Sequence, residues 1–460
     1  MHIGRYEIRG LLGRGGMGAV YKAAMPVTGR MVALKVLKPA DILIDIMGSD
    51  ALTSLFLGEA ATMARISHAN VASVLDVDEG GAATPPHFTM EYYCGNLGAL
   101  MGETYDAERP SRRLGAQAAL ALARQMLHGL DRLHYEGIVH RDIKPFNVML
   151  AEDEGGLGTV RLIDFGLSRL RGERPARHPG MVVGSPWYTA PEQEADPDKA
   201  DSRADIFSVG VTLYRMLTGK LPEPGRDSIG LVLDDPELAG PDWDGLFSRA
   251  LAAVPDNRFA DAAAMLDALD RAETDWLAAR DAACSLADPP DPWPSRLRRP
   301  PARATPIKTG ARQARSLFGL DELWRPNSAA PALFSDQGDG TVLQPGPDGS
   351  LAGLLWERDG SRYPLTWERA KAHAARLGER AFAGRTGWRL PTIDELAALM
   401  GRAAHPGLSC QAPAFDPRKS RLWSADTKAF TAAWYADAHL GYIGWQDRSC
   451  RFFARAVCPA

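Results

Sequence analysis

Two short stretches of the chain place a base and two oxygen ligands for a metal near one another, and they constrain the fold more than any other feature. The first reads His140-Arg141-Asp142-Ile143-Lys144-Pro145-Phe146-Asn147, and the second reads Asp164-Phe165-Gly166. A carboxylate can take the proton of a hydroxyl nucleophile, and carboxylate and amide oxygens are ligands that Mg²⁺ prefers. Asp142 is therefore a candidate base, and Asn147 and Asp164 are candidate metal ligands.

The length and composition of the chain predict more than one domain. At 460 residues it exceeds one ordinary core, and 45% hydrophobic residues are enough to build two or three. A formal net charge of -4 gives no overall attraction to nucleic acid or membrane. Residues 1–10 lack the apolar region of a signal peptide, and no window approaches the roughly 18 consecutive apolar residues of a membrane span. We therefore expect a cytoplasmic protein with no nucleic-acid partner and no membrane span.

The cysteines fit a reducing compartment. There are five, an odd number, and none has the CxxC or histidine-containing spacing of a metal site. They are Cys94, Cys284, Cys410, Cys450 and Cys458. A disulfide among the last three is the alternative.

The pattern of apolar residues changes from strands to helices within the first 284 residues. Residues 6–8, 19–23 and 31–36 read as three successive strands of an antiparallel sheet. Apolar residues then recur at helical spacing over residues 114–136, 204–217 and 260–277. We expect a small sheet lobe, residues 1–93, and a larger helical lobe, residues 94–284, with a ligand in the cleft between them.

A glycine-rich turn and a lysine predict a phosphate site in the sheet lobe. The turn reads Gly13-Arg14-Gly15-Gly16-Met17-Gly18-Ala19-Val20, and glycines allow backbone N–H groups to approach phosphate oxygens. Lys35 lies on the third strand, where it can contact phosphates if a carboxylate orients it. Glu59 is the best candidate for that carboxylate, and Asp45 and Asp50 are weaker ones.

Together with Ala190-Pro191-Glu192, Asp205 and Arg258, these motifs resemble the Hanks-type protein kinases over residues 5–271. The resemblance implies an α+β bilobal fold and transfer of the γ-phosphoryl group of ATP to a Ser or Thr hydroxyl of a protein. Mg²⁺ is the metal that it implies, with Mn²⁺ as an alternative. Residues 184–188 and Lys144 resemble the Ser/Thr branch of the family.

The resemblance also assigns roles to single residues. It implies that Asp142 is the base, that Lys144 contacts the γ-phosphate, that Lys35 and Glu59 pair, and that Glu192 pairs with Arg258. The nucleotide would lie against Gly13, Gly15, Gly16, Gly18, Val20, Ala33, Lys35, Met90, Glu91, Tyr93 and Met149 or Leu150, and the metal against Asn147 and Asp164.

The expected activation loop departs from the family pattern. Kinases with an arginine before the catalytic aspartate, as Arg141 is here, use it to bind a phosphorylated loop residue. Residues 169–184 contain no Ser, Thr or Tyr. Either Glu173 supplies a permanent charge, or the loop's packing or the second domain orders it, or the enzyme is poorly active; we prefer the first two jointly. Ser185 keeps a hydroxyl able to bond Asp142 or Lys144.

Residues 285–316 are rich in proline and arginine and predict a stiff, basic linker. A solvated spacer is the simpler interpretation. The alternative is a docking site for an acidic partner, or a kinase substrate segment that includes Ser295, Thr305 and Ser316.

Residues 317–460 are rich in tryptophan and predict a second domain. Helices are expected over residues 366–377 and 392–400, each opened by a threonine N-cap. Asp336 and Asp339 lie among glycines, and we interpret them as a turn rather than a calcium loop, because the EF-hand spacing is missing.

Residues 334–457, above all Trp388-Arg389-Leu390-Pro391-Thr392, resemble the C-type-lectin-like domain at the C-terminus of a bacterial collagen-like adhesin. Related domains occur in formylglycine-generating-enzyme-like proteins and in variable proteins diversified by retroelements. The resemblance implies a mixed α/β fold used for ligand binding. Core positions are expected for Trp356, Trp367 and Trp388, and a candidate binding face for Trp434, Tyr435, Tyr442 and Trp445.

Two functions are compatible with these patterns. The first is an active Ser/Thr kinase with protein substrates, whose second domain recognises a ligand or substrate. The alternative is a weakly active kinase or nucleotide-binding scaffold in which the second domain carries recognition.

Overall fold

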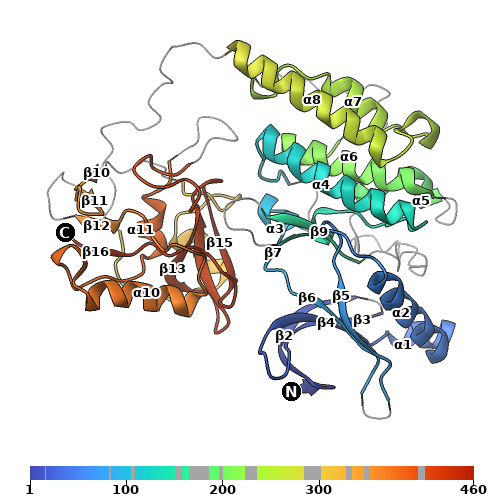
Figure 1. The fold of residues 1–460 in the computed structure, drawn as a ribbon, viewed down its shortest axis with the longest axis horizontal. Coiled ribbons are helices and arrows are strands. Elements are labelled where there is room, and N and C mark those ends of the chain that lie inside the picture. The colour runs from blue at the N-terminus through green and yellow to red at the C-terminus, as the bar shows by residue number, and fades with distance from the viewer. Residues whose placement is uncertain are drawn as a thin grey trace.

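The computed structural model describes residues 1–15, 17–81, 84–104, 109–151, 158–164, 186–195, 200–222, 236–283, 302–327, 334–346, 353–401 and 410–460. The chain forms a kinase-like unit over residues 1–283 and a C-terminal unit over residues 302–460, which lie side by side (Figure 1). Predicted features at Gly16, Phe165, Gly166, Glu173, Ser185, Cys284 and Ser295 lie outside the described residues. Among the described helices, none combines the length and apolar character needed to cross a bilayer.

The first lobe is a six-stranded antiparallel sheet in the order β1-β2-β3-β4-β6-β5. Its strands are β1 (His2–Ile3), β2 (Tyr6–Gly15), β3 (Gly18–Ala24), β4 (Met31–Leu37), β5 (Val74–Asp78) and β6 (His87–Glu91). On β4 the side chains alternate between two apolar cores: Val32 and Leu34 pack with Tyr6, whereas Ala33 and Leu37 join the main core. Two helices, α1 (Asp41–Met47) and α2 (Ser49–Ala64), follow β4.

The second lobe is mainly helical and surrounds α4, whose apolar stripe includes Leu120, Leu127 and Leu130, all fully buried. Its helices are α3 (Leu97–Met101), α4 (Ala116–Tyr135), α5 (Pro191–Ala195), α6 (Ser202–Thr218), α7 (Trp243–Ala250) and α8 (Ala262–Ala283). A small sheet of β7 (Gly95–Asn96), β8 (Val148–Ala151) and β9 (Thr159–Leu162) lies where the two lobes join (Figure 1). The predicted bilobal kinase fold is confirmed.

The C-terminal unit contains two antiparallel sheets, ordered β10-β11-β12-β16 and β13-β14-β15. Their strands are β10 (Ser335–Asp336), β11 (Thr341–Gln344), β12 (Leu354–Glu357), β13 (Arg421–Thr427), β14 (Ala432–Asp437), β15 (Tyr442–Asp447) and β16 (Val457–Pro459), and the helices are α9 (Ala311–Leu317), α10 (Trp367–Glu379) and α11 (Ile393–Ala397). Asp336 accepts a hydrogen bond from the Gly338 N–H within the β10–β11 hairpin, as expected of a turn.

Two details of this unit differ from the sequence prediction. Thr392 forms a full capping box with Glu395, but Thr366 at the N-cap of α10 makes no side-chain capping bond. The proposed binding face is wrong for Trp434, which is fully buried, and for Tyr435 and Tyr442, which are 8% and 4% exposed. The alternation along β14 and β15 turns these aromatic rings into apolar cores instead.

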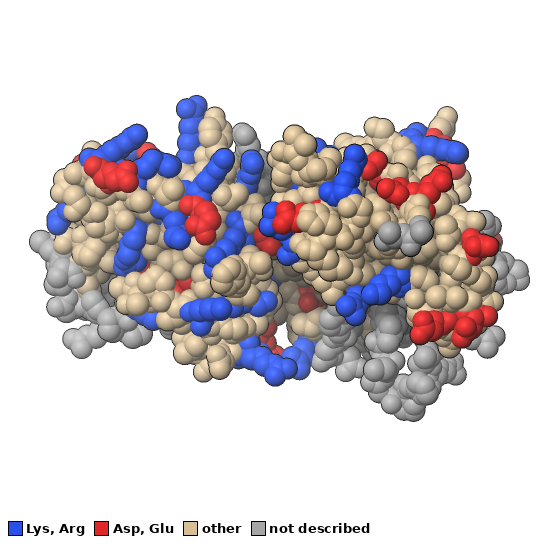
Figure 2. Space-filling model, turned by 90° about the horizontal axis from the view of Figure 1, so that it is seen from below, with Lys and Arg blue, Asp and Glu red and all other residues tan. Residues whose placement is uncertain are grey.

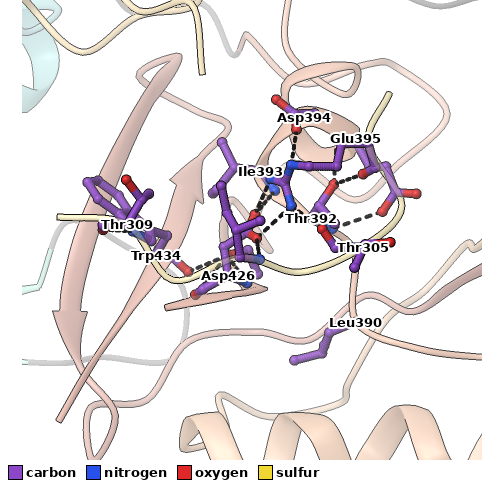
Figure 3. Close-up of polar contacts among 12 residues, drawn as sticks. Thr305, Thr309, Leu390, Thr392, Ile393, Asp394, Glu395, Asp426 and Trp434 are labelled. Atoms are coloured by element: carbon purple, nitrogen blue, oxygen red, sulfur yellow. Dashed lines mark hydrogen bonds and ion pairs between the residues drawn. The ribbon is translucent and has the colours of Figure 1, made fainter. Parts of the chain in front are cut away.

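Part of the predicted linker belongs to the C-terminal unit (Figure 3). Asp426, fully buried, accepts hydrogen bonds from both terminal nitrogens of Arg303 and from the backbone N–H groups of Ile307 and Ile393. The Trp434 indole N–H donates to the Thr309 carbonyl. The solvated spacer is therefore wrong for residues 303–309, because the Arg303 side chain and backbone groups of Ile307 and Thr309 are hydrogen-bonded to the second domain.

The cysteine prediction is also wrong, because Cys94 and Cys450 form a disulfide. Cys410 and Cys458 are both buried. This pair was not predictable from the sequence, because its members are 356 residues apart and lie in different units.

Asp426→Ala should lower the free energy of unfolding of the C-terminal unit by about 3 kcal/mol, because Arg303 and two backbone N–H groups lose a buried acceptor. Denaturant unfolding of the full chain measures this. Glu368→Gln is the matched control: Glu368 pairs with Lys371 on the exposed face of α10, and such pairs contribute at most about 1 kcal/mol. Equal effects of the two substitutions would contradict the assignment.

Candidate active site

A buried lysine joins the two lobes of the kinase-like unit. Lys35 lies on β4 and is 8% exposed; its Nζ is 3.0 Å from Glu59 Oε1 on α2 and 3.1 Å from Asp164 Oδ1 after β9. Burial by itself lowers the pKa of Lys35, but the carboxylates of Asp164 and Glu59 outweigh it and raise that pKa above its ordinary value. The structure thus confirms Glu59 as the partner, rather than Asp45 or Asp50.

The stretch from Asp142 to Asn147 folds into a compact loop closed by a short 3₁₀ turn, Pro145–Asn147. Lys144 Nζ lies 2.8 and 2.9 Å from the two carboxylate oxygens of Asp142. The Asn147 amide nitrogen donates to the Asp142 carbonyl at 2.7 Å and to its carboxylate at 2.8 Å. Asp142 keeps about a fifth of its side chain exposed, 22%, so this fixed carboxylate is also accessible to a substrate.

The backbone of this loop is held by Asp205, a fully buried residue near the start of α6. Its carboxylate accepts the backbone N–H groups of His140 and Arg141 at 2.8 and 2.7 Å, and a ring nitrogen of His134 lies 2.8 Å away. Arg141 has a φ of 63°, an unfavourable backbone conformation for a side chain of its size. Asp205 therefore maintains the loop conformation that positions the Asp142 side chain.

Two histidines that help to hold this loop, His134 and His140, were not assigned roles from the sequence. His134 contacts Asp205 from α4, and fully buried His140, whose pKa burial lowers, accepts the Asp142 N–H at Nδ1, 3.3 Å away. The sequence offers no sign of the His134 contact, because it depends on how α4 packs against α6.

The glycine-rich turn joins β2 to β3. No atom lies within 4 Å of where a Cβ would stand on Gly13 or Gly15, so the space beside them is open. A Cβ on Gly18 would stand 2.1 Å from the Val36 carbonyl oxygen, so only glycine allows β3 to approach β4 here. Val20 is half-buried on β3 opposite Lys35 of β4.

The predicted adenine contacts lie on neighbouring strands. Ala33 of β4 pairs with Met90 of β6, and both are buried. Beyond Met90, Glu91 accepts a hydrogen bond from the Tyr93 hydroxyl at 3.1 Å. Met149 on β8 pairs with Asn96 of β7, directly after this connection. The segment from Met90 to Tyr93 is thus the link between the lobes.

The residues predicted to hold metal fit a magnesium ion. Because the Asn147 amide nitrogen is engaged with Asp142, the amide oxygen is the atom it can offer to a cation. Asp164, whose Oδ1 accepts a hydrogen bond from Lys35, supplies a carboxylate. Mg²⁺ is usually bound by one or two such protein oxygens together with substrate phosphates.

Arg141 is in the position expected to bind a phosphorylated loop residue. Its Nη2 donates to the Ala200 carbonyl at 3.2 Å. Its Nη1 is buried and has no hydrogen-bond partner in the described part of the chain. The loop over residues 165–185 lies outside the described residues.

The Glu192–Arg258 pair is confirmed: both terminal nitrogens of Arg258 contact the Glu192 carboxylate, at 2.6 and 2.7 Å. The pair anchors α5, which follows residues 186–190, to the segment before α8.

Comparison with known proteins supports the same family. The chain is 35% identical over 280 residues to the serine/threonine-protein kinase PksC of Streptomyces coelicolor, and 34% identical over 282 residues to the serine/threonine-protein kinase Pkn1 of Myxococcus xanthus. These alignments cover 57% and 58% of this chain, but 48% and 38% of those proteins, so the chain spans about half or less of their length.

The DNA damage-responsive serine/threonine-protein kinase RqkA of Deinococcus radiodurans is 40% identical over 223 residues, which are 48% of this chain and 31% of that protein. Among solved structures, the kinase domain of PknI from Mycobacterium tuberculosis is 26% identical, with a TM-score of 0.44, over 59% of this chain and 98% of that one.

Two family models match the chain. The Lcl C-terminal domain matches residues 349–458, which overlap the range 334–457 predicted to resemble the adhesin domain. The protein kinase domain matches residues 6–235, which are half of the 460 residues and include Lys35, Glu59, Asp164 and the loop from Asp142 to Asn147. On this match, and on the geometry of Lys35, Glu59, Asp142 and Asp164, the chain belongs to the protein kinase family.

Proposed function

We propose that this protein is an active Ser/Thr kinase that transfers the γ-phosphoryl group of ATP to protein hydroxyls. The observation that carries this proposal is the Asp142 carboxylate, which is fixed by Lys144 and Asn147 and remains partly exposed. A base within a rigid, preorganised set of charges is what phosphoryl transfer requires of a protein. The relatives named as Ser/Thr kinases support the choice of substrate class.

Each charged residue has a separate role in this reaction. Asp142 accepts the proton of the substrate hydroxyl as its oxygen bonds to the γ-phosphorus and ADP leaves. Lys35, held by Glu59, neutralises charge on the α- and β-phosphates, and Lys144 does so at the γ-phosphate. Mg²⁺, when bound by Asn147 and Asp164, supplies additional positive charge for the phosphate oxygens.

We further propose a C-type-lectin-like fold and a recognition role for the C-terminal unit. The match to the Lcl C-terminal domain and the combination of two antiparallel sheets with α10 and α11 support it. On the face shown in Figure 2, blue basic side chains are more prominent over this unit than red acidic ones.

The second candidate is a weakly active kinase or nucleotide-binding scaffold in which the C-terminal unit carries the function. It is favoured by the unpartnered Nη1 of Arg141 in the described structure and by the lack of Ser, Thr or Tyr in residues 169–184. We prefer the active kinase, because the ion pair between Lys35 and Glu59 is formed.

Asp142→Asn should lower the rate of phosphoryl transfer by about 10²–10⁴-fold, since the amide cannot accept the hydroxyl proton. Transfer of radiolabelled phosphate to a generic protein substrate measures this. Asp131→Asn, on the exposed side of α4, is the matched control and should keep the wild-type rate. Transfer that survives the Asp142 substitution would reject Asp142 as the base.

Activity should be independent of phosphorylation within residues 169–184, because that segment offers no hydroxyl acceptor. Treatment with a Ser/Thr phosphatase, followed by its removal, should leave the initial rate unchanged. Mass spectrometry should find any loop phosphate only at the flanking Ser168 or Ser185. A large loss of activity after phosphatase treatment would contradict this prediction.

A further inference from the structure

The C-terminal unit is covalently attached to the link between the kinase lobes. Cys94, which directly follows Tyr93, forms a disulfide with Cys450, and their Cα atoms are 5.8 Å apart. The Gln446 side-chain amide donates to the Cys94 carbonyl. Tyr92 and Cys94 also pack against the core formed by Tyr435, Tyr442 and other aromatic residues of the C-terminal unit. The connection therefore involves the backbone, the side chains and a covalent bond.

The same unit contacts the sheet lobe through Lys22 of β3. Its Nζ lies 2.5 Å from Asp447 Oδ1 and 2.6 Å from Ser449 Oγ, and Lys22 is only 5% exposed. The ammonium also lies 4.8 Å from the centre of the Tyr92 ring. Burial by itself raises the pKa of Asp447, but the ion pair with Lys22 and the hydrogen bonds from Ser449 outweigh it and lower that pKa below its ordinary value.

The helical lobe is contacted through Arg112, just before α4. Its guanidinium stands 3.8 Å from the centre of the Tyr442 ring and donates to the Leu323 carbonyl at 2.9 Å. On the kinase side it donates to the carbonyls of Leu100 and Ala99 in α3. Arg112 is 3% exposed, so it is enclosed by the two units together.

These contacts span both lobes and their link. Figure 1 shows β15 facing β7 and α3, and Figure 2 shows a continuous surface from one unit to the other. Lys22 belongs to one lobe and Arg112 to the other, while Cys94 lies between them. A rigid body fixed at all three points opposes any opening or rotation of one lobe relative to the other.

We propose that the C-terminal unit is a redox-sensitive clamp on the kinase, in which the Cys94–Cys450 disulfide holds it across both lobes and favours the closed, nucleotide-binding arrangement. This inference rests on the proposed kinase function, because it assigns regulation to the same site. With the disulfide formed, Lys35 is paired with both Glu59 and Asp164, the contacts that tie the lobes together. Reduction leaves only the non-covalent contacts, so the population of open lobes rises.

The switching reaction is a thiol–disulfide exchange with an external dithiol, either a protein or a small molecule. A thiolate of the dithiol attacks Cys94, which is half-buried, and Cys450, which is 1% exposed, leaves as a thiolate and is protonated. The second thiol of the dithiol then releases Cys94. Two electrons and two protons pass from the dithiol to the cysteines, and the dithiol becomes a disulfide. The partial exposure of Cys94 makes this disulfide open to such exchange, because access to the attacked sulfur controls the rate.

The test compares the full-length protein in its oxidised and reduced states, with reduction by a phosphine that is then removed. Alkylation of free thiols followed by peptide mapping verifies the state of Cys94 and Cys450. Reduction should weaken the affinity for a fluorescent ATP analogue by about fivefold or more, the usual range of coupling between linked sites. It should also speed amide hydrogen exchange at residues 90–96 and 442–450.

Cys450→Ser is the matched variant, because it removes the disulfide without changing the kinase-like unit. It should behave like the reduced wild type in both measurements and should not respond to the reductant. Cys458→Ser, a change at a buried free thiol, should keep the wild-type response. The wild-type comparison needs no substitution, so it stands even if a variant does not fold.

The outcomes separate the clamp from the proposed function. Hydrogen exchange at residues 90–96 that is unchanged by reduction would overturn the clamp even in a fully active kinase. A protein that transfers no phosphate, but whose exchange at these residues rises on reduction, would retain the clamp and reject the catalytic function. A response to reductant that persists in Cys450→Ser would also overturn the clamp, because another thiol would then be responsible.

Discussion

The buried ammonium group of Lys35 is the interaction on which the rest of the kinase-like unit depends. A lysine that is 8% exposed is strongly destabilising without a counter-charge, and here two carboxylates from different elements supply it. Glu59 can reach it only if α2 packs against the sheet, and Asp164 only if the lobes approach each other. Removing one partner of such a buried pair costs about 3–5 kcal/mol. The positions of α2 and of the two lobes thus depend on the contacts of the Lys35 Nζ atom.

A second constraint shapes the loop that carries the base. The positive φ of Arg141 is unfavourable by itself, and the two backbone hydrogen bonds to Asp205 offset it. Because Asp205 is fully buried on α6, the loop conformation depends on the packing of the helical lobe rather than on the loop's own residues. Asp142 is therefore positioned by two separate networks, Asp205 behind it and Lys144 and Asn147 beside it.

The features that could be predicted from the sequence are those that depend on residues close together in the chain. The glycine turn, Lys35, the loop from Asp142 to Asn147 and the helix of Glu59 are recognisable because each function requires a residue type at a fixed spacing. The binding-face hypothesis for Trp434 failed because aromatic residues in a loop-rich segment do not reveal which way their strands face. The spacer predicted around Arg303 failed because its acceptor, Asp426, is distant in sequence. The Cys94–Cys450 pair is equally hidden, since only the docking of two units brings its members together.

Control of this kinase follows from how these constraints combine. Kinases with an arginine directly before the catalytic aspartate, as Arg141 is here, normally order their activation loop by phosphorylation of a residue in that loop. Here residues 169–184 have no acceptor for a phosphate group, whereas Lys22, Cys94 and Arg112 all bind the C-terminal unit on the side of the link between the lobes. A bond at the link acts on the distance between Lys35 and Asp164, because each lobe carries one of these two residues. Regulation through the docked domain requires no change at the loop and leaves the catalytic residues themselves untouched.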